Sequence, residues 1–363
     1  MSRAHASVAP GGRAPGRGPD GIRHIAYYLR HPGNLHYFAS LKPYLDRLRR
    51  NPNYRHHLVI VDGLAQVASE PEYDGYRALF TQDAALDRYD LVVTPTYLRP
   101  HERSARTRAV QVFHGMSDKP FTYERDFSDY LLCLCAGQRQ VDRLRANPEN
   151  WDVNCVLVGY PKFNAYPRIP KPFRNGKRTL VYCPTWRKQG ISSIERFLDS
   201  PATIERLADR YNLVVKPHPN IFNVVRDHYD AALVDKLEQM TRLGDLSLVR
   251  SGNAMSWFAQ ADLFIGDISA SGYEWLHFGR PMVFLNPKPG VLRPTTDVTG
   301  MTYLWQCGPV CDAVESLPAT IDAALDADSF AAVRERILQY SVHRPRQDGA
   351  AARGAAEIER LLS

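Results

Sequence analysis

The chain has 363 residues, of which 44% are hydrophobic and 23% are charged. This length exceeds what one ordinary core holds, and the composition excludes a disordered or fibrous chain, so we expect a globular protein of two domains. The formal net charge of +7 favours an anionic partner such as a nucleotide, a polyanionic polymer or a lipid surface. No nucleic-acid reading module is recognisable, so no nucleic-acid partner is expected.

The beginning of the chain carries no structural pattern. Residues 1–20 are rich in Gly, Pro and Arg and contain no apolar segment, so we expect a disordered leader and not a secretory signal. No apolar run approaches the roughly 18 residues of a membrane span. The six cysteines form no Cys-x-x-Cys pair, which argues against zinc and favours reduced thiols in the cytoplasm.

Residues 21–165 alternate short apolar runs with amphipathic stretches, a pattern typical of a parallel, doubly wound sheet. The predicted strands of this first domain are Ile22–Leu29, His57–Val61, Leu91–Thr94, Val110–Phe113, Leu131–Cys135 and Cys155–Val158. The stretch Leu35–Arg50 has an apolar face and a basic end, so it could lie on an anionic membrane. A helix that covers the sheet is the favoured interpretation.

Residues 166–178, rich in Pro and basic side chains, are interpreted as a linker. Residues 179–340 repeat the alternation, and residues 341–363 predict a C-terminal helix. The predicted strands are Thr179–Cys183, Leu213–Lys216, Leu246–Val249, Leu263–Ile265 and Met282–Leu285, and the predicted helices include Ser193–Arg210, Tyr229–Leu243, Asn253–Ala261 and Ser271–Phe278. We therefore expect an α/β fold of two facing Rossmann-like domains with a cleft between them.

Four polar clusters follow predicted strands, at the sheet edge where open α/β sheets bind ligands. They are His114–Lys119 (HGMSDK), Pro184–Lys188 (PTWRK), Lys216–Pro219 (KPHP) and Gly266–Ser269 (GDIS). Taken singly, each has an ordinary structural interpretation as a capped helix, a stiff proline turn or solvated loop charges. One cluster from the first domain and three from the second are expected to converge on the interdomain cleft.

The residue types in these clusters suit a diphosphate ligand. Arg187, Lys216 and His218 offer positive charge and donors. Ser269 and Ser271 stand at a predicted helix start, where backbone N–H groups and the helix dipole favour anions. His114 suits a general base from the opposite domain, and Gly115 permits close approach. None of the four clusters contains a Walker loop, a GxGxxG or a DxD motif, so we expect no cofactor and no required divalent metal.

The order of these segments resembles the CDP-glycerol glycerophosphotransferase family of the teichoic-acid primase and polymerase type. The matching segments are FHGMSDK, a Gly159–Lys162 turn (GYPK), YCPTWR, KPHP, GDISASGYEWLHFGRPMVF and RQDGAAARGAAEI. The resemblance implies a two-domain GT-B fold, an acceptor-binding first domain and a nucleotide-donor-binding second domain. It also implies a cytoplasmic active site with peripheral attachment to the membrane.

The resemblance also implies roles for single residues, with His114 and His218 as catalytic residues. The implied donor-binding residues are Gly115, Thr185, Arg187, Lys216, His218, Asp267, Ser269 and Ser271. Three positions depart from the family pattern: Met116 replaces a threonine, Ile268 a tyrosine and Ala270 a serine. These departures leave the phosphate contacts and the acceptor open.

The predicted function is transfer of glycerol phosphate, or a related alditol phosphate, from a CDP-activated donor with release of CMP. The partners are CDP-glycerol or another CDP-alditol, and a lipid-linked or polysaccharide acceptor of the cell envelope. Two alternatives stay open: a GT-B glycosyltransferase or UDP-sugar 2-epimerase-like enzyme, and a non-catalytic scaffold that binds a polymer or lipid.

Overall fold

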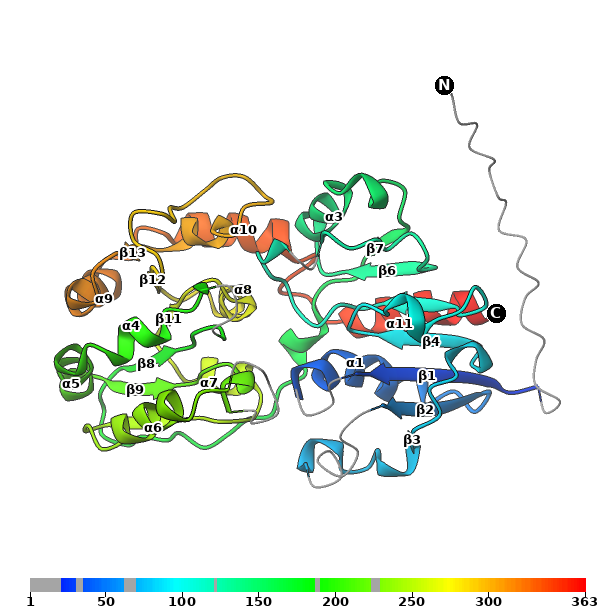
Figure 1. The fold of residues 1–363 in the computed structure, drawn as a ribbon, viewed down its shortest axis with the longest axis horizontal. Helices are drawn as coiled ribbons and strands as arrows, with labels where there is room; N and C mark the ends of the chain where they lie inside the picture. The colour runs from blue at the N-terminus through cyan, green and yellow to red at the C-terminus, as the bar shows by residue number, and fades with distance from the viewer. Residues whose placement is uncertain (1–20, 31–34, 62–69, 121–122, 187–189, 223–228) are drawn as a thin grey trace.

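The computed structural model describes residues 21–30, 35–61, 70–120, 123–186, 190–222 and 229–363. Its framework is two parallel sheets that lie side by side, one in each half of the molecule (Figure 1). The predicted leader at residues 1–20 and the predicted donor residue Arg187 lie outside the described residues.

The first sheet has seven strands in the order β3-β2-β1-β4-β5-β6-β7. The strands are β1 (Arg23–Leu29), β2 (Tyr54–Ile60), β3 (Phe80–Thr81), β4 (Leu91–Thr94), β5 (Ala109–Gln111), β6 (Leu132–Cys135) and β7 (Cys155–Leu157). In β1, Tyr27 is in register with Leu58 of β2 and with Val93 of β4. The central strands are near-continuous apolar runs because helices and loops cover both faces of a parallel sheet.

The second sheet has six strands in the order β10-β9-β8-β11-β12-β13. The strands are β8 (Thr179–Tyr182), β9 (Asn212–Val215), β10 (Leu246–Leu248), β11 (Leu263–Gly266), β12 (Met282–Leu285) and β13 (Val310–Cys311). The prediction of two parallel α/β sheets is therefore confirmed. The edge strands β3 and β13 were not predicted, because two residues are too few to show a periodic pattern.

The α-helices are packed against these sheets. Their bounds are α1 (Leu35–Leu48), α3 (Gln138–Arg145), α4 (Ile194–Leu198), α5 (Pro201–Arg210), α6 (Ala231–Met240), α7 (Ala254–Phe258), α8 (Ala270–Trp275), α9 (Leu317–Asp326), α10 (Ala331–Ser341) and α11 (Ala350–Leu362). The prediction of one helix over Ser193–Arg210 was wrong. Pro201 starts a second helix there because a proline cannot donate to the preceding turn and disfavours helical backbone in the residue before it.

The helix α1 covers the first sheet with its apolar face inward. Phe38, Leu41, Leu45 and Leu48 are all buried in the core of this half. The alternative in which this apolar face lies on a membrane is therefore excluded, and the sheet-covering interpretation is confirmed. No helix in the described parts of the chain combines the length and the hydrophobicity that a bilayer crossing needs.

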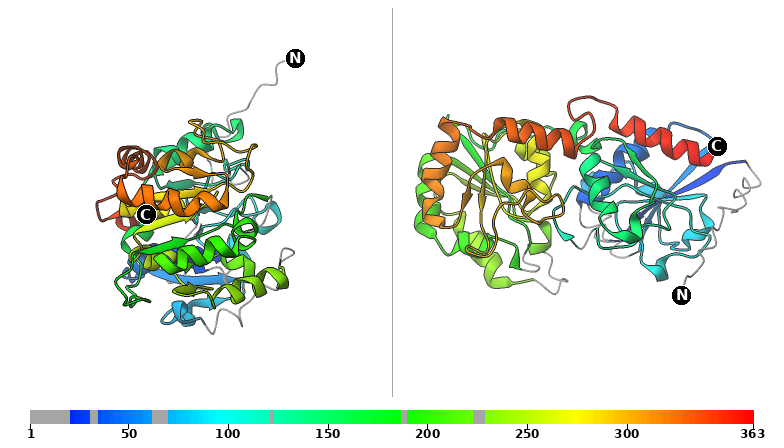
Figure 2. Two further views of the ribbon diagram at one scale, coloured as in Figure 1. Left: turned by 90° about the vertical axis from the view of Figure 1, so that its left-hand side faces the viewer. Right: turned by 90° about the horizontal axis from the view of Figure 1, so that it is seen from above.

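The C-terminal segment returns from the second half to the first. Figure 2 shows α10 on one lobe and α11 on the other, and Ile358 and Leu362 of α11 are buried in the core of the first half. The end of α10 meets the start of α3, and a Cβ atom on Gly137 would lie 2.3 Å from the carbonyl carbon of Ser341. The two halves are thus packed backbone against backbone along this side.

Candidate active site

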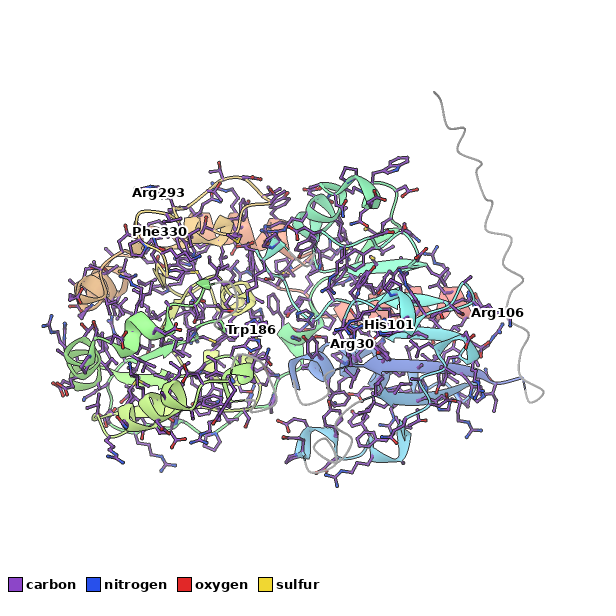
Figure 3. All side chains as sticks on the ribbon, viewed as in Figure 1. Arg30, His101, Arg106, Trp186, Arg293 and Phe330 are labelled. Atoms are coloured by element: carbon purple, nitrogen blue, oxygen red, sulfur yellow. The ribbon has the colours of Figure 1, made fainter. Side chains whose placement is uncertain are left out.

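A cleft of about 1010 Å³ opens between the two halves. Figure 3 shows Arg30 of the first half and Trp186 of the second half on its facing sides, and both residues line the cleft. The predicted site residues that line it are His114, Lys216, His218, Ser269 and Ser271. The loops that follow β5, β9 and β11, together with the start of α8, supply these residues, because the carboxyl ends of the strands face this gap.

His114 stands on the first half's side of the cleft and is half-buried. Its Nδ1 lies 3.2 Å from the carbonyl oxygen of Pro95. A carbonyl can only accept, so Nδ1 carries the proton of the neutral ring, and Nε2 is the nitrogen that can accept one. The Tyr37 ring meets the imidazole edge-on, with centroids 4.8 Å apart. Burial, followed by the nearby Lys162 ammonium, lowers the pKa of His114 to about 4.

The backbone before His114 takes an unusual conformation. The predicted strand Val110–Phe113 ends at Gln111, and Phe113 has a φ of 49°, in the left-handed region. A side chain other than glycine is strained there, so the surrounding packing must hold it. Phe113 packs against Phe127, with ring centroids 5.5 Å apart. This turn ends the strand and directs the next residue, His114, into the cleft.

Lys216 and His218 stand on the opposite side, directly after β9. Lys216 is only 3% exposed, and its Nζ donates to the carbonyl oxygen of Ser251 at 3.4 Å. Burial lowers the pKa of Lys216, while Cys183 and Glu274 oppose that shift. His218 accepts at Nδ1 from the backbone N–H of Asn220 at 3.1 Å, so Nε2 of this ring carries a proton and can donate. The Trp186 ring stacks on His218, with centroids 5.9 Å apart.

The hydroxyls of Ser269 and Ser271 lie at the start of α8. The Ser269 side chain caps this helix by accepting from the Ser271 backbone N–H at 3.3 Å, and the two hydroxyl oxygens are 3.2 Å apart. A Cβ atom placed on Gly115 would lie 3.4 Å from the Cβ of Ala270. The loop of the predicted base and the loop of the predicted donor site therefore approach within contact distance.

Asp267 and Thr185 are buried beneath the cleft and do not line it. Asp267 accepts hydrogen bonds from the backbone N–H of Thr185 at 2.9 Å and from the backbone N–H of Ser193 at 2.9 Å. Burial raises the pKa of Asp267 to about 6, although these hydrogen bonds oppose the shift. In this structure Asp267 therefore holds the loop after β8 in place.

Several charged residues of the site were not assigned a role by sequence reasoning. Lys119 donates from Nζ to the Thr185 hydroxyl at 2.5 Å, across the boundary between the halves. Lys162 donates to the His114 carbonyl oxygen at 2.7 Å and lies 3.5 Å from a carboxylate oxygen of Glu274. The available signal was positional: Lys119 stands in the HGMSDK segment, and Lys162 ends the GYPK turn.

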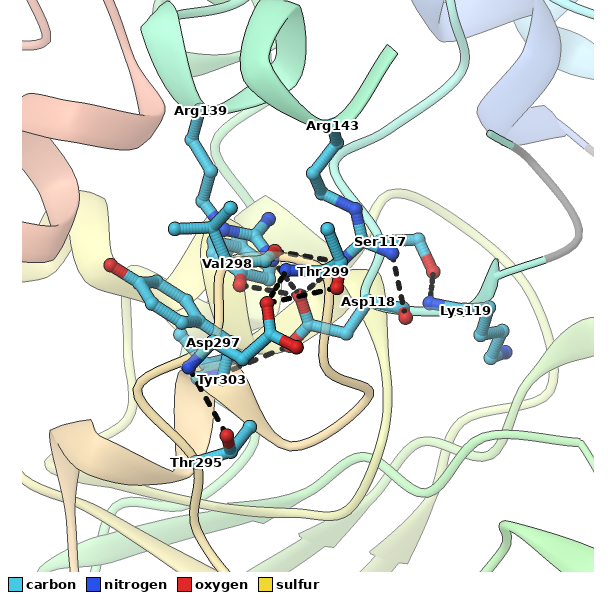
Figure 4. Close-up of polar contacts among 12 residues, drawn as sticks. Ser117, Asp118, Lys119, Arg139, Arg143, Thr295, Asp297, Val298, Thr299 and Tyr303 are labelled. Carbon is cyan, nitrogen blue, oxygen red and sulfur yellow. Dashed lines mark hydrogen bonds and ion pairs between the residues drawn. The ribbon is translucent and has the colours of Figure 1, made fainter. Parts of the chain in front are cut away.

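Asp118 forms a second link between the halves (Figure 4). It pairs with Arg139 and Arg143 of α3, and it accepts from the Tyr273 hydroxyl at 2.7 Å and from the backbone N–H of Leu304 at 3.2 Å. The same two arginines donate to the carbonyl oxygen of Val298. Since Tyr273, Leu304 and Val298 belong to the second half, this buried group fixes the loop of His114 against that half.

Comparison with known proteins is consistent with this geometry. Residues 167–357 match the family described as CDP-Glycerol:Poly(glycerophosphate) glycerophosphotransferase. Among solved structures, the wall teichoic acid polymerase TagF is similar, with a TM-score of 0.63 and 14% identity over 96% of this chain and 91% of that chain. A search of curated proteins gave no match.

Two further solved structures share the architecture. A putative UDP-N-acetylglucosamine 2-epimerase from Listeria monocytogenes has a TM-score of 0.56 and 14% identity over 93% of this chain and 96% of that chain. The glycosyltransferase SnogD from Streptomyces nogalater has a TM-score of 0.54 and 14% identity over 94% and 100% of the respective chains. Similarity at these identities shows the fold, and the two-domain GT-B prediction is confirmed.

Proposed function

Because the chain belongs to the CDP-glycerol:poly(glycerophosphate) glycerophosphotransferase family, we propose that it transfers glycerol phosphate, or a related alditol phosphate, from a CDP-activated donor. The acceptor is a hydroxyl of a lipid-linked or polymeric glycan of the cell envelope, and CMP is released. The enzyme is a transferase of the CDP-glycerol glycerophosphotransferase type. One of the similar solved structures is that of TagF with CDPG, which supports a CDP-linked donor.

The observation that carries this proposal is the placement of His114 across one cleft from Lys216 and His218. In the proposed reaction, an acceptor hydroxyl attacks the β-phosphorus of the donor, and its proton passes to Nε2 of His114. The bond from the β-phosphorus to the bridging oxygen breaks, and CMP leaves with that oxygen. Phosphoryl transfer needs mainly positioning and charge stabilisation, which histidines and lysines can supply.

We assign the donor diphosphate to the second half's side of the cleft. Lys216 and the Nε2–H of His218 are the donors that face it, and the hydroxyls of Ser269 and Ser271 add further polar contacts. The Trp186 ring, stacked on His218, offers an apolar surface beside the phosphates. Asp267 and Thr185 support this site through the loop after β8, and Arg187 is the next residue after Trp186 in the sequence. No metal ion is needed for these steps.

The acceptor then enters from the first half, past Tyr37 and Arg30. A lipid-linked acceptor would bring the enzyme to the inner face of the membrane. The exposed basic end of α1, formed by Arg47, Arg49 and Arg50, is the surface that we propose to meet anionic lipid. Sedimentation with anionic and neutral liposomes tests this placement, and equal binding to both would remove the electrostatic argument.

The donor class is tested by incubating the protein with CDP-glycerol or CDP-ribitol and measuring CMP release in the presence of envelope glycan acceptors. We expect release with at least one CDP-alditol and loss of release in His114→Gln. Thermal stabilisation by UDP or GDP, without stabilisation by CDP or CMP, would instead support a glycosyltransferase or epimerase. Donor binding without any turnover would support a scaffold.

A further inference from the structure

Lys162 connects the proposed base to the donor side of the cleft. It belongs to the short 3₁₀ turn Pro161–Asn164, which follows the last strand of the first sheet. Its side chain is 5% exposed, and its Nζ contacts the His114 carbonyl oxygen at 2.7 Å and Glu274 Oε1 at 3.5 Å. A buried ammonium is costly unless paired, and here its partners come from both halves of the molecule.

Glu274 is the partner in the second half. It lies in α8, the helix that begins directly after Ser269, so it belongs to the same element as the proposed donor loop. Its Oε1 also accepts from the Tyr160 hydroxyl at 2.7 Å. The carboxylate therefore holds two side chains of the turn that carries Lys162.

The Lys162 ammonium contacts the His114 carbonyl oxygen next to a strained part of the backbone. The preceding residue, Phe113, is in the strained left-handed conformation, and the Ser40 hydroxyl donates to the same carbonyl at 3.3 Å. Nδ1 of the ring faces the Pro95 carbonyl. Hydrogen bonds therefore hold both the backbone carbonyl and the ring of His114. Loss of the Lys162 contact would leave the strained turn with one fewer support.

We propose that Lys162 is a positioning residue for His114, and that the Lys162–Glu274 pair links the orientation of this base to the helix of the donor loop. The inference rests on the proposed function, since it assigns Lys162 a part in the same transfer. Lys162 does not touch the reacting atoms in this assignment. It acts through the His114 carbonyl and through the charge that it places beside the imidazole.

The charges around His114 give this role a measurable signature. The charged groups that act on the ring are Lys162, Lys119 and Arg125, in that order of effect, and each lowers the pKa of His114. The Tyr37 ring packs on its edge. Replacing Lys162 with an uncharged side chain should therefore raise the pKa of His114 by about one pH unit, and Lys119→Met should raise it less.

The experiment is a pH titration of the histidine side chains by nitrogen-15 NMR, with His114→Gln used to assign the His114 signal. We expect an upward shift in Lys162→Met and a value close to wild type in Lys162→Arg, which keeps the charge and can donate to the carbonyl. Lys162→Met leaves the Glu274 carboxylate without its ammonium partner. The double variant Lys162→Met/Glu274→Gln removes that carboxylate charge, and it is titrated in place of the single variant if the single variant does not fold. An unchanged His114 pKa in the folded uncharged variants would overturn the inference.

Kinetics supply the second readout. In Lys162→Met, the midpoint of the acid limb of the kcat/KM profile should shift to higher pH, together with the pKa of His114. At pH 8, kcat should fall about tenfold to a hundredfold while the KM for the donor changes little. A higher KM for the donor with kcat unchanged would contradict a positioning role. The NMR titration needs no substrate, so failure of wild-type turnover would remove the proposed function without deciding this inference.

Discussion

The buried charge group around Asp118 allows a quantitative prediction about how the two halves stay together. We consider Asp118→Asn, which keeps the size of the side chain and removes its charge. The native Asp118 side chain is 5% exposed and faces the guanidinium groups of Arg139 and Arg143, each with a side chain that is 2% exposed. The substitution therefore leaves two buried cations without their carboxylate partner.

Removing one partner of a buried ion pair costs about 3–5 kcal/mol of folding free energy, because the remaining charge is left uncompensated. The hydrogen bonds from Tyr273 and Leu304 to Asp118 also weaken, since an amide group offers one acceptor oxygen in place of two. We expect a total loss of about 3–5 kcal/mol, a large fraction of the stability of a typical domain.

Urea unfolding measured by tryptophan fluorescence tests this value, because Trp275 and Trp305 are buried in the second half. The matched control is Asp297→Asn. Asp297 lies close to this charge group, in the second-half loop that carries Val298 (Figure 4), but it is exposed and accepts mainly from Thr299 of its own loop. This control should lose less than about 1.5 kcal/mol. An Asp118→Asn protein within about 1 kcal/mol of wild type, or equal losses in both variants, would refute the reasoning.

Three further predictions concern the site. His114→Gln should lower kcat by about a hundredfold or more with donor affinity in calorimetry nearly unchanged, and near-normal turnover would remove His114 as the base. Lys216→Met should weaken CDP-glycerol binding by roughly tenfold to a hundredfold, the worth of a charge-assisted hydrogen bond, and unchanged affinity would contradict the assignment. Because the pKa of His114 is lowered to about 4, the ring stays neutral from pH 8 down to about pH 5, and protonation removes the base only below that. The acid limb of kcat/KM should therefore lie near pH 4, and a limb near the ordinary histidine value of about 6.5 would contradict a pKa lowered by burial and by Lys162.

The sequence contained most of the sheet framework. Leu91–Thr94 and Met282–Leu285 were predicted to the residue, because each is a short apolar run bounded by polar turn residues. The same reasoning located His114, Lys216 and His218, since polar residues directly after a parallel strand must lie at its carboxyl edge. Strand ends that are set by backbone conformation could not be predicted in this way, as the left-handed turn at Phe113 shows.

Charges buried by docking of the two halves could not be recognised from local sequence. Asp118, Lys119 and Lys162 were given no role of their own by the sequence, because the residues that contact them in the structure are distant in the chain. Their partners lie far along the chain, Thr185 for Lys119 and Glu274 for Lys162. Asp267 shows the converse: its position after β11 favoured a ligand contact, whereas in the structure its carboxylate holds the backbone of two neighbouring segments.

Two of the three positions that depart from the family pattern are buried between the halves in this structure. Met116 and Ile268 are 3% and 2% exposed, and both belong to one hydrophobic cluster that contains residues of both halves. Ala270 faces Gly115, and a Cβ atom placed on that glycine would lie 3.4 Å from the Cβ of Ala270. Met116 and Ile268 thus contribute apolar packing between the halves, whereas Ala270 lines the cleft beside Ser269 and Ser271. With these residues at the three positions, His114, Lys216 and His218 still line one cleft.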